Sequence, residues 1–291
     1  MEEFIQQTLN GLVVGSSYVL TALGLTLIFG MLDMLNFAHG ELLMVGAFLA
    51  LAITTGLGLS YFFAIPLSML IVAVLGIVME RVVFRPLQYS DRINLLVSSL
   101  GISIILQNAV LLIWGPDPRS LSSPFSDAQV HLGSAVLSGH RLFVVVVSLI
   151  LIGVIYYVVQ KTKLGVAMRA CAFDMETAKL MGIPANMIII STFAIGAGLA
   201  AAAGALLAPI FSVYPTMGVM ATMKAFVVVL LGGIGNISGA IVGGFLLGLV
   251  ETYTAGYWHS EYKDVIAFLI MILILLIKPS GLFGKHIREK V

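Results

Sequence analysis

The residues best suited to chemistry interrupt long apolar runs, and the first interruption is the segment 33–41, DMLNFAHGE. It places Asp33, Asn36, His39 and Glu41 between two apolar runs. A charged group at the centre of a bilayer costs about 2.5–3.5 kcal/mol on insertion scales, so these side chains need an interface or a wet, protein-lined cavity. His39 and Glu41 are two apart and do not share a helical face, which argues against a metal pair of the HExxH kind. The segment is therefore either a turn in which Asn36 and Glu41 cap helices, or a broken helix that lines a gate.

The second interruption is LGGIGNISG at 231–239, in the middle of the apolar run 221–250. This run is too long for one ordinary span of about 20 residues. Irregular backbone at membrane depth cannot face lipid, so unwound chain at Gly232 and Gly233 is expected to face a polar cavity. Broken helices present helix ends and backbone groups to ligands. The candidate residues of a substrate pathway are therefore Asn36, His39, Glu41, Gly232, Gly233 and Asn236.

Small residues at regular spacing predict tight helix packing in the same region. A four-residue spacing separates Gly235, Gly239 and Gly243, and also Gly244 and Gly248. This spacing lets helix backbones approach closely. Lys224 and Glu251 bracket the run, and we interpret both as snorkelling or interface residues rather than as transport groups.

A third stretch, KLGVAMRACAFDMETAKLMGI at 163–183, is neither apolar enough to span a bilayer nor loose enough to be a linker. Asp174 can cap a short helix, and Glu176 in its first turn suits the helix dipole. Glu176 and Lys179 are three apart and share a face. Gly182, followed by a proline, is typical of a helix end. The stretch is either an interfacial helix resting on lipid head groups or a docking element, for which the candidate residues are Gly165, Arg169, Asp174, Glu176, Lys179 and Gly182.

Several classes of site are excluded by motif. The chain has no GxxxxGK[ST], HExxH or GxSxG sequence. The segment GGIGNISG contains GxG but lacks the full GxGxxG spacing of a dinucleotide-binding site. The net charge of +1 gives no reason to expect nucleic acid, and the lone Cys171 excludes an intrachain disulfide. We expect no catalytic, metal or cofactor site, and few buried charges. The combination indicates a substrate path without its own energy source, which points to a translocation subunit driven by separate ATPases.

The composition requires a membrane-embedded scaffold for these segments. The 291 residues are 60% hydrophobic and 10% charged, whereas soluble domains carry about 25% charged residues. Apolar runs long enough to span occur at about 9–30, 38–57, 61–80, 94–114, 142–160, 188–211 and 263–278, in addition to 221–250.

The distribution of basic residues predicts the orientation of these spans. Arginines and lysines gather at 81–92, at 161–187 and in the tail, where Lys278, Lys285, Arg288 and Lys290 lie. These segments should be cytoplasmic, and the N-terminus, which lacks Lys and Arg, should be outside. An inside C-terminus then requires 221–250 to be a re-entrant pair or two short spans, with turns at 232–239. The alternative is a chain of eight plain spans.

We therefore expect an all-α, polytopic membrane protein of about eight transmembrane helices plus a glycine-broken re-entrant or short-helix pair. The loop 115–140 is rich in Pro, Gly and Ser and reads as turns on the outer face. Asn36, Gly40 and Phe48 loosely echo Asn236, Gly239 and Phe245, which suggests a possible internal repeat of the kind found in transporters.

Four motifs carry a resemblance to a known family: GLTLIFGMLDMLNFAHGELLMVGAF (24–48), the 163–183 stretch, FVVVLLGGIGNISGAIVGG (226–244) and KPSGLFG (278–284). With these motifs in this order, the chain resembles the LivH-type permeases of branched-chain amino acid ABC importers over nearly its whole length. The resemblance implies a single permease domain, 1–291, in a bacterial inner membrane. It also implies a homologous LivM-like permease, two cytosolic LivG/LivF-like ATP-binding subunits and a periplasmic or lipid-anchored binding protein as partners. The 163–183 stretch would then be the element that couples to the ATPase.

The substrate is less constrained than the family, because similar permeases carry urea, short-chain amides or other amino acids. Two further hypotheses remain open from the residues alone. One is a stand-alone channel or facilitator for small neutral solutes. The other is a membrane enzyme that uses His39 and Glu41 as acid and base, although neither residue belongs to a recognisable catalytic constellation.

Overall fold

The computed structural model describes residues 2–32, 34–88, 90–125, 128–132, 135–278 and 280–284. The predictions for Asp33 and for the basic tail residues Lys285, Arg288 and Lys290 lie outside these residues. Within them, seven helical segments are long and apolar enough to cross a membrane, and Met217–Gly232 is a shorter apolar helix. The prediction of a helical, polytopic membrane protein is confirmed.

The α-helices follow the expected apolar runs closely. In chain order they are α1 (Glu2–Leu32), α2 (His39–Leu51), α3 (Tyr61–Met79), α4 (Arg85–Leu87), α5 (Arg92–Trp114), α6 (Gly139–Lys161), α7 (Lys163–Phe173), α8 (Met175–Leu180), α9 (Ala185–Leu207), α10 (Met217–Gly232), α11 (Ile237–Tyr257) and α12 (Tyr262–Ile277). Short π-helical segments extend α2 over Ala52–Gly56 and join α3 to α4 over Glu80–Phe84.

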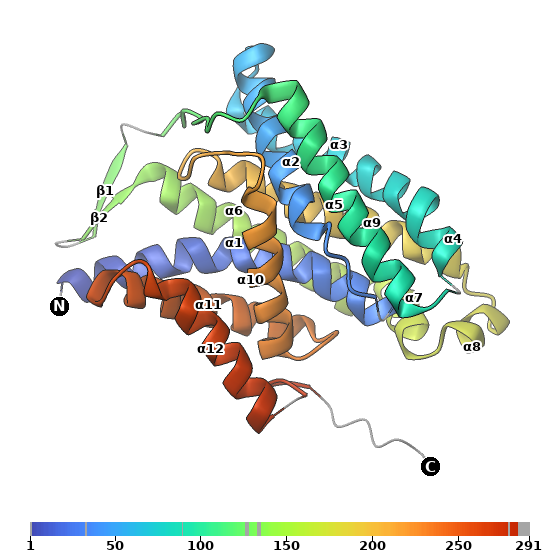
Figure 1. Ribbon diagram of the computed structural model, residues 1–291. Coiled ribbons are helices and arrows are strands. Elements are labelled where there is room, and N and C mark those ends of the chain that lie inside the picture. Colours follow the sequence, from blue (N-terminus) through green and yellow to red (C-terminus); the bar gives the residue numbers. More distant parts are fainter. Residues whose placement is uncertain are drawn as a thin grey trace.

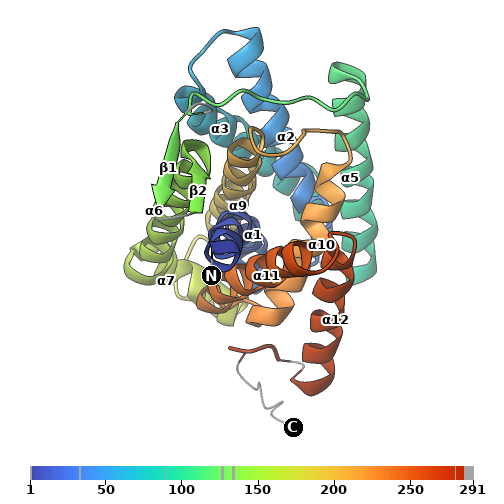
Figure 2. The ribbon, with the colours of Figure 1, turned by 90° about the vertical axis from the view of Figure 1, so that its left-hand side faces the viewer.

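Helix α1 is the axis of the bundle. In Figure 2, which looks along it, α1 lies near the centre with α6, α9, α10 and α11 around it. Figure 1 shows the N-terminus, β1 and β2 at one end of the molecule, which we call the hairpin end, and α4, α7 and α8 at the other, the α7–α8 end. The two basic segments 81–92 and 161–187 thus lie at the same end, away from the N-terminus, as the predicted topology requires. Which end faces the cytoplasm stays a prediction.

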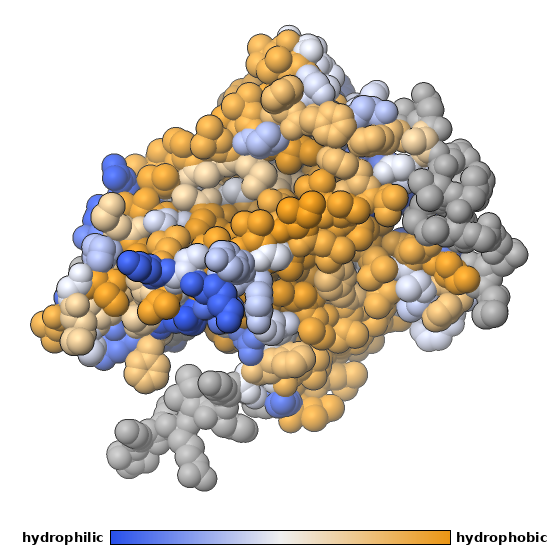
Figure 3. Space-filling view, turned by 180° about the vertical axis from the view of Figure 1, so that it is seen from behind, coloured by the Kyte–Doolittle hydropathy of each residue, from blue (hydrophilic) through white to orange (hydrophobic). Residues whose placement is uncertain are grey.

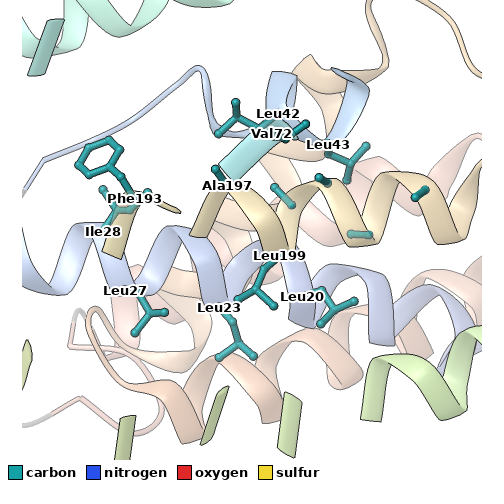
Figure 4. Close-up of a cluster of buried hydrophobic side chains, with 14 of the residues drawn as sticks. Leu20, Leu23, Leu27, Ile28, Leu42, Leu43, Val72, Phe193, Ala197 and Leu199 are labelled. Carbon is teal, nitrogen blue, oxygen red and sulfur yellow. The ribbon is translucent and has the colours of Figure 1, made fainter. Parts of the chain in front are cut away.

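The bundle is held together by apolar side chains from four helices. Figure 4 shows Leu20, Leu23, Leu27 and Ile28 of α1 beside residues of α2, α3 and α9, among them Phe193. On the outside, one broad face is largely hydrophobic, and its hydrophilic residues gather towards the α7–α8 end (Figure 3). This distribution fits a bundle whose flank is solvated by lipid and whose α7–α8 end is solvated by water.

Glycines at regular spacing bring helix backbones into direct contact. A Cβ at Gly244 would lie 2.9 Å from Val19 N of α1, and one at Gly15 of α1 would lie 3.0 Å from Phe245 Cα of α11. A Cβ at Gly239 would overlap the carbonyl of Gly232. The predicted close packing of small residues in this half of the chain is confirmed.

Two expectations about loops need correction. Within 115–140, which we expected to form turns, β1 (Gln129–Leu132) and β2 (Ala135–Ser138) pair as an antiparallel hairpin. The run 221–250 is divided between α10 and α11, and its turn is confined to 233–236, more tightly than the predicted 232–239. Asn36 precedes α2 and Asn236 caps α11, so the two asparagine motifs each introduce a helix, and the internal repeat stays a prediction.

Packing of α9 against α2 is tight enough to be tested by one methyl group. A Cβ at Gly204 of α9 would overlap the carbonyl oxygen of Leu43 in α2, whereas a Cβ at Gly101 of α5 meets nothing within 4 Å. We expect Gly204→Ala to lower the free energy of unfolding by about 1–3 kcal/mol, as overpacking does. Gly101→Ala should leave it unchanged or raise it by up to about 1 kcal/mol. Thermal denaturation of the two purified variants measures the difference, and equal stability would contradict this account of the α2–α9 contact.

Candidate functional site

Helix α2 begins inside the bundle. Asn36, His39 and Glu41 are each 0% exposed. The His39 ring nitrogen Nε2 lies 3.1 Å from the carbonyl oxygen of Thr21, a residue in the middle of the long helix α1. The chain therefore runs back from the end of α1 to the middle of the bundle before α2 starts. The structure shows an entry into α2 that is buried in the bundle, and Asn36 Oδ1 accepts from Ala38 N at 3.0 Å, as the capping interpretation predicts. That this segment lines a gate stays a prediction.

Helix α10 also begins inside the bundle and meets the start of α2. The backbone amide of Gly40 donates to Thr222 Oγ1 at 2.9 Å, and a Cβ at Gly40 would overlap the carbonyl oxygen of Gly218. From this contact the two helices run in opposite directions, α2 towards the top of Figure 1 and α10 towards the bottom. Two helix N-termini, each with positive partial charge, thus lie against each other at the centre of the protein.

Glu41 lies beside these two helix starts. Its Oε1 accepts hydrogen bonds from Ser103 Oγ at 3.0 Å and from Gln107 Nε2 at 2.7 Å, both on α5. Its Oε2 is buried and has no hydrogen-bond partner among the described residues. A negative side chain in the first turn of α2 is stabilised by the helix dipole. Glu41 therefore links α5 to the central contact of α2 with α10.

The second predicted break lies elsewhere. Gly233 has φ +98°, a conformation that glycine adopts without strain. The Gly232 carbonyl accepts from Phe283 N at 3.2 Å, and Asn236 Nδ2 donates to the Phe283 carbonyl at 2.9 Å. Asn236 Oδ1 also caps α11 by accepting from Gly239 N at 3.0 Å. Gly232, Gly233 and Asn236 therefore pack against 281–284, and the structure does not bring them to Asn36, His39 and Glu41.

A cavity of about 630 Å³ lies between α1, α6, α10, α11 and α12 and the segment after α9. None of the six predicted pathway residues is among those that line it. Four of its polar lining residues, Tyr18, Lys224, Glu251 and Asp264, form a connected cluster, which we call the polar wall. Lys224 Nζ lies 2.8 Å from Glu251 Oε2 and 2.9 Å from Asp264 Oδ1.

The interpretation of Lys224 and Glu251 as snorkelling residues is wrong, as is the expectation of few buried charges. They are 7% and 4% exposed, and they pair with each other across the interior. A charge that lies within an apolar run needs a partner. Lys224 and Glu251 carry opposite charges at the two ends of the same apolar region, and this is the feature from which their pairing could have been predicted.

The predicted geometry of the 163–183 stretch is confirmed. Asp174 caps α8, because Thr177 N donates to its Oδ1 at 3.0 Å and Thr177 Oγ1 donates to its Oδ2 at 2.6 Å. These two bonds hold the pKa of the Asp174 carboxyl below its ordinary value. Glu176 and Lys179 form an ion pair at 2.8 Å, and Gly182 ends the segment with φ +82°.

Gly165 and Arg169 instead attach α7 to α6. A Cβ at Gly165 would overlap the carbonyl oxygen of Val159, near the end of α6. Arg169 Nη1 donates to the same carbonyl, which is one of those that a helix C-terminus leaves free. Arg169 therefore has a local structural partner. No feature of the sequence pattern predicts this contact.

Three apolar side chains on and beside α8 had no signal in the sequence pattern. Phe173, Leu180 and Met181 are 94%, 87% and 79% exposed, outside the membrane-spanning helices. Beside them, Lys179 and Ile183 line a groove of about 270 Å³ together with 184–187. Large apolar side chains exposed next to an ion pair are typical of a protein-binding surface. We call Phe173, Leu180 and Met181 the apolar knob.

Comparison with known proteins identifies relatives that match nearly the whole chain. Residues 7–275 match the family model described as branched-chain amino acid transport system / permease component. The chain is 40% identical to the high-affinity branched-chain amino acid transport system permease protein BraD of Pseudomonas aeruginosa, over 99% of this chain and 98% of BraD. It is 38% identical, with the same coverage, to the corresponding permease LivH of Escherichia coli. It is also 24% identical to the ribose import permease protein RbsC of Haemophilus influenzae, over 97% of this chain and 85% of RbsC.

No solved structure matches the chain. The family model covers far more than half of the sequence, and the two relatives above 30% identity are matched almost from end to end. The chain belongs to the permease-component family of branched-chain amino acid transport systems.

Proposed function

We propose that this chain is the membrane-spanning translocation subunit of an ATP-binding-cassette importer for branched-chain amino acids. The observation that carries the proposal is the apolar knob beside the Glu176–Lys179 pair, because it gives a passive bundle a surface on which a separate ATPase can act. Family membership supports the substrate class. The described residues offer no nucleotide-binding loop, so the energy must be supplied by other subunits.

The partners follow from the two ends of the bundle. Two cytosolic ATP-binding subunits would act on the α7–α8 end, one on this chain and one on a homologous LivM-like permease. A periplasmic or lipid-anchored binding protein would deliver substrate at the hairpin end, to the loops 115–140 and 251–262. This arrangement places the protein in a bacterial inner membrane with its N-terminus outside and its C-terminus in the cytoplasm, as the basic segments favour.

The path for substrate begins at the cavity and is closed by the contact of α2 with α10. Closure of the ATPase dimer on ATP would be passed to 166–182 and from there to the spanning helices. For substrate to pass, Gly40 and Gly218 must separate, since their backbones are in contact. Affinity for the substrate is expected to reside mainly in the binding protein, so that the membrane site can release its ligand.

Reconstitution tests the function as a whole. Proteoliposomes that contain the chain with its permease partner, ATPases and binding protein should accumulate leucine, isoleucine or valine only when ATP is supplied to the ATPase side. Ribose, the substrate named for the distant relative, should not be accumulated. Leucine flux through the isolated chain without ATP would contradict the proposal and support a facilitator instead.

The docking role of the apolar knob is tested by Leu180→Ser. Burying a leucine completely is worth about 1.5–3 kcal/mol, so the affinity for the ATPase should fall about ten- to a hundredfold. Leu112→Ser is the matched control, because Leu112 is also 87% exposed but lies on α5 near its hairpin end. Co-purification of the ATPase and substrate-stimulated ATP hydrolysis measure the effect. Equal behaviour of the two variants would count against docking at α8.

The cap of α8 is tested by comparing Asp174→Ala with Asp174→Asn. Asparagine caps helices as well as aspartate does and alanine does not, so only the alanine variant should reduce substrate-stimulated ATP hydrolysis several-fold. Because the pKa of Asp174 is lowered in the folded state, the ionised cap stabilises α8 above the ordinary Asp pKa of about 3.9. This stabilisation is lost only as the pH falls through the lowered pKa. Stimulation in the wild type should therefore show no Asp174 titration between pH 5 and 8, and a large loss in the asparagine variant would argue that charge, not capping, matters.

A further inference from the structure

We propose that the polar wall of the 630 Å³ cavity, formed by Tyr18, Lys224, Glu251 and Asp264, is a binding site for the ammonium group of a zwitterionic amino acid. The proposal rests on the proposed function, because it names the group of the transported substrate that this site recognises. The proposal depends on which hydrogen-bond donors and acceptors of the four side chains are already engaged within the cluster.

The donors of the cluster are held by its own oxygens. Lys224 Nζ donates to Tyr18 Oη at 3.0 Å and to Glu251 Oε2 at 2.8 Å, and it lies 2.9 Å from Asp264 Oδ1. The contact with Asp264 Oδ1 is an ion pair without a hydrogen bond, so Lys224 uses two of the three protons of its ammonium group in hydrogen bonds. The Tyr18 hydroxyl donates its single proton to Glu251 Oε2 at 2.7 Å. The Tyr18 hydroxyl therefore has no proton left for a ligand, and the Lys224 ammonium is held by three oxygens of its own cluster.

Two carboxylate oxygens of the cluster, Glu251 Oε1 and Asp264 Oδ1, are buried and have no hydrogen-bond partner among the described residues. Glu251 lines the cavity and is only 4% exposed. A buried carboxylate oxygen without a partner is costly. A ligand that donates a hydrogen bond to it would remove that cost.

The net charge of the cluster also favours a positively charged ligand. Glu251 and Asp264 carry two negative charges and Lys224 carries one positive charge, so the cluster has an excess negative charge. Lys224 and Glu251 are buried, whereas the Asp264 side chain is 34% exposed, so the excess is most poorly screened at Glu251. A ligand with a positive charge and hydrogen-bond donors, such as a primary ammonium, satisfies both requirements.

The rest of the cavity suits the remainder of such a ligand. Arg141 and Lys263 also line it, from the first turns of α6 and α12, and they can receive a carboxylate. Leu43, Met217 and Met220 supply apolar surface, and methionine adapts to side chains of different shape. The volume falls within the roughly 300–1,000 Å³ of small-molecule sites. The cavity therefore combines an ammonium acceptor, cations and an adaptable apolar wall.

Two analogues of leucine, each of which lacks one of its charged groups, test the ammonium and the carboxylate separately. The purified chain in lipid nanodiscs, without binding protein, is titrated with 3-methylbutylammonium chloride, which lacks the carboxylate, or with sodium 4-methylpentanoate, which lacks the ammonium. We expect the denaturation temperature to rise with millimolar 3-methylbutylammonium and to stay constant with 4-methylpentanoate or sodium chloride. An equal rise with either of the last two, or no rise with the first, would overturn the assignment.

Glu251→Gln and Asp264→Asn each remove the excess charge at nearly constant volume, and either one suffices if the other fails to fold. Both should abolish the response to 3-methylbutylammonium. Glu80→Gln is the matched control, because Glu80 is 2% exposed, also has a buried unpartnered Oε2, and does not line the cavity. It should keep the response. A response retained in Glu251→Gln or Asp264→Asn, or lost in Glu80→Gln, would refute the site.

Transport separates this inference from the proposed function. In the reconstituted complex, ATP-driven leucine uptake should fall at least tenfold in Glu251→Gln and be retained in Glu80→Gln. Failure of the wild-type complex to take up leucine would reject the proposed function, whereas the analogue titration judges the ammonium site independently. Normal leucine uptake by Glu251→Gln in an active complex would overturn the ammonium site alone.

Discussion

Hydrocarbon offers no hydrogen bonds, so each backbone polar group inside a membrane protein needs a partner within the protein. The two helices that begin inside this bundle depend on that constraint most directly. At the start of α2, Ala38 N donates to Asn36 Oδ1 at 3.0 Å, Phe37 N to Ser99 Oγ at 3.2 Å and Gly40 N to Thr222 Oγ1 at 2.9 Å. Side chains from α5 and α10 thus do what water does at an ordinary helix end. The polar residues around the start of α2 therefore help to stabilise a helix that begins inside the protein.

The same constraint ties the central contact to the cavity through one short helix. Thr222 of α10 holds the start of α2, and two residues later Lys224 holds Tyr18, Glu251 and Asp264 from three other helices. Displacement of α10 would therefore disturb the closed contact and the ion-paired wall together. Neither end of α10 is loosely tethered: Gly218 abuts Gly40, and the carbonyl of Gly232 is bonded to Phe283. Packed contacts of this kind change between discrete arrangements rather than deform continuously, which is what the proposed alternation between two access states would require.

The features that sequence reasoning predicted well are local ones. The cap at Asp174, the Glu176–Lys179 pair and the helix end at Gly182 each involve residues within four positions of one another, so spacing alone determines which groups can meet. The spanning helices were equally accessible, because length and hydropathy define them.

Features that depend on tertiary packing were not accessible in this way. Lys224 and Glu251 are 27 positions apart, and each on its own resembles an interface residue. The burial of the entry into α2 depends on partners such as Ser99 and Thr222, which lie far away in the chain. The exposure of Leu180 could not be predicted from the sequence, because an apolar residue in a short helix is usually buried.

Helix α6 connects the two functional ends of the molecule. Its first turn carries Arg141, which lines the cavity, and its last turns carry Val159, whose carbonyl accepts from Arg169 of α7. At 1.5 Å per residue, a 23-residue helix spans about 35 Å. Because Arg169 and the close approach of Gly165 clamp α7 onto the end of α6, a push on α7 cannot be absorbed at that junction. Under the proposed function, force applied at α8 would pass through this junction to α6 and to the cation at the cavity. Arg169 would then serve coupling by joining α7 to α6.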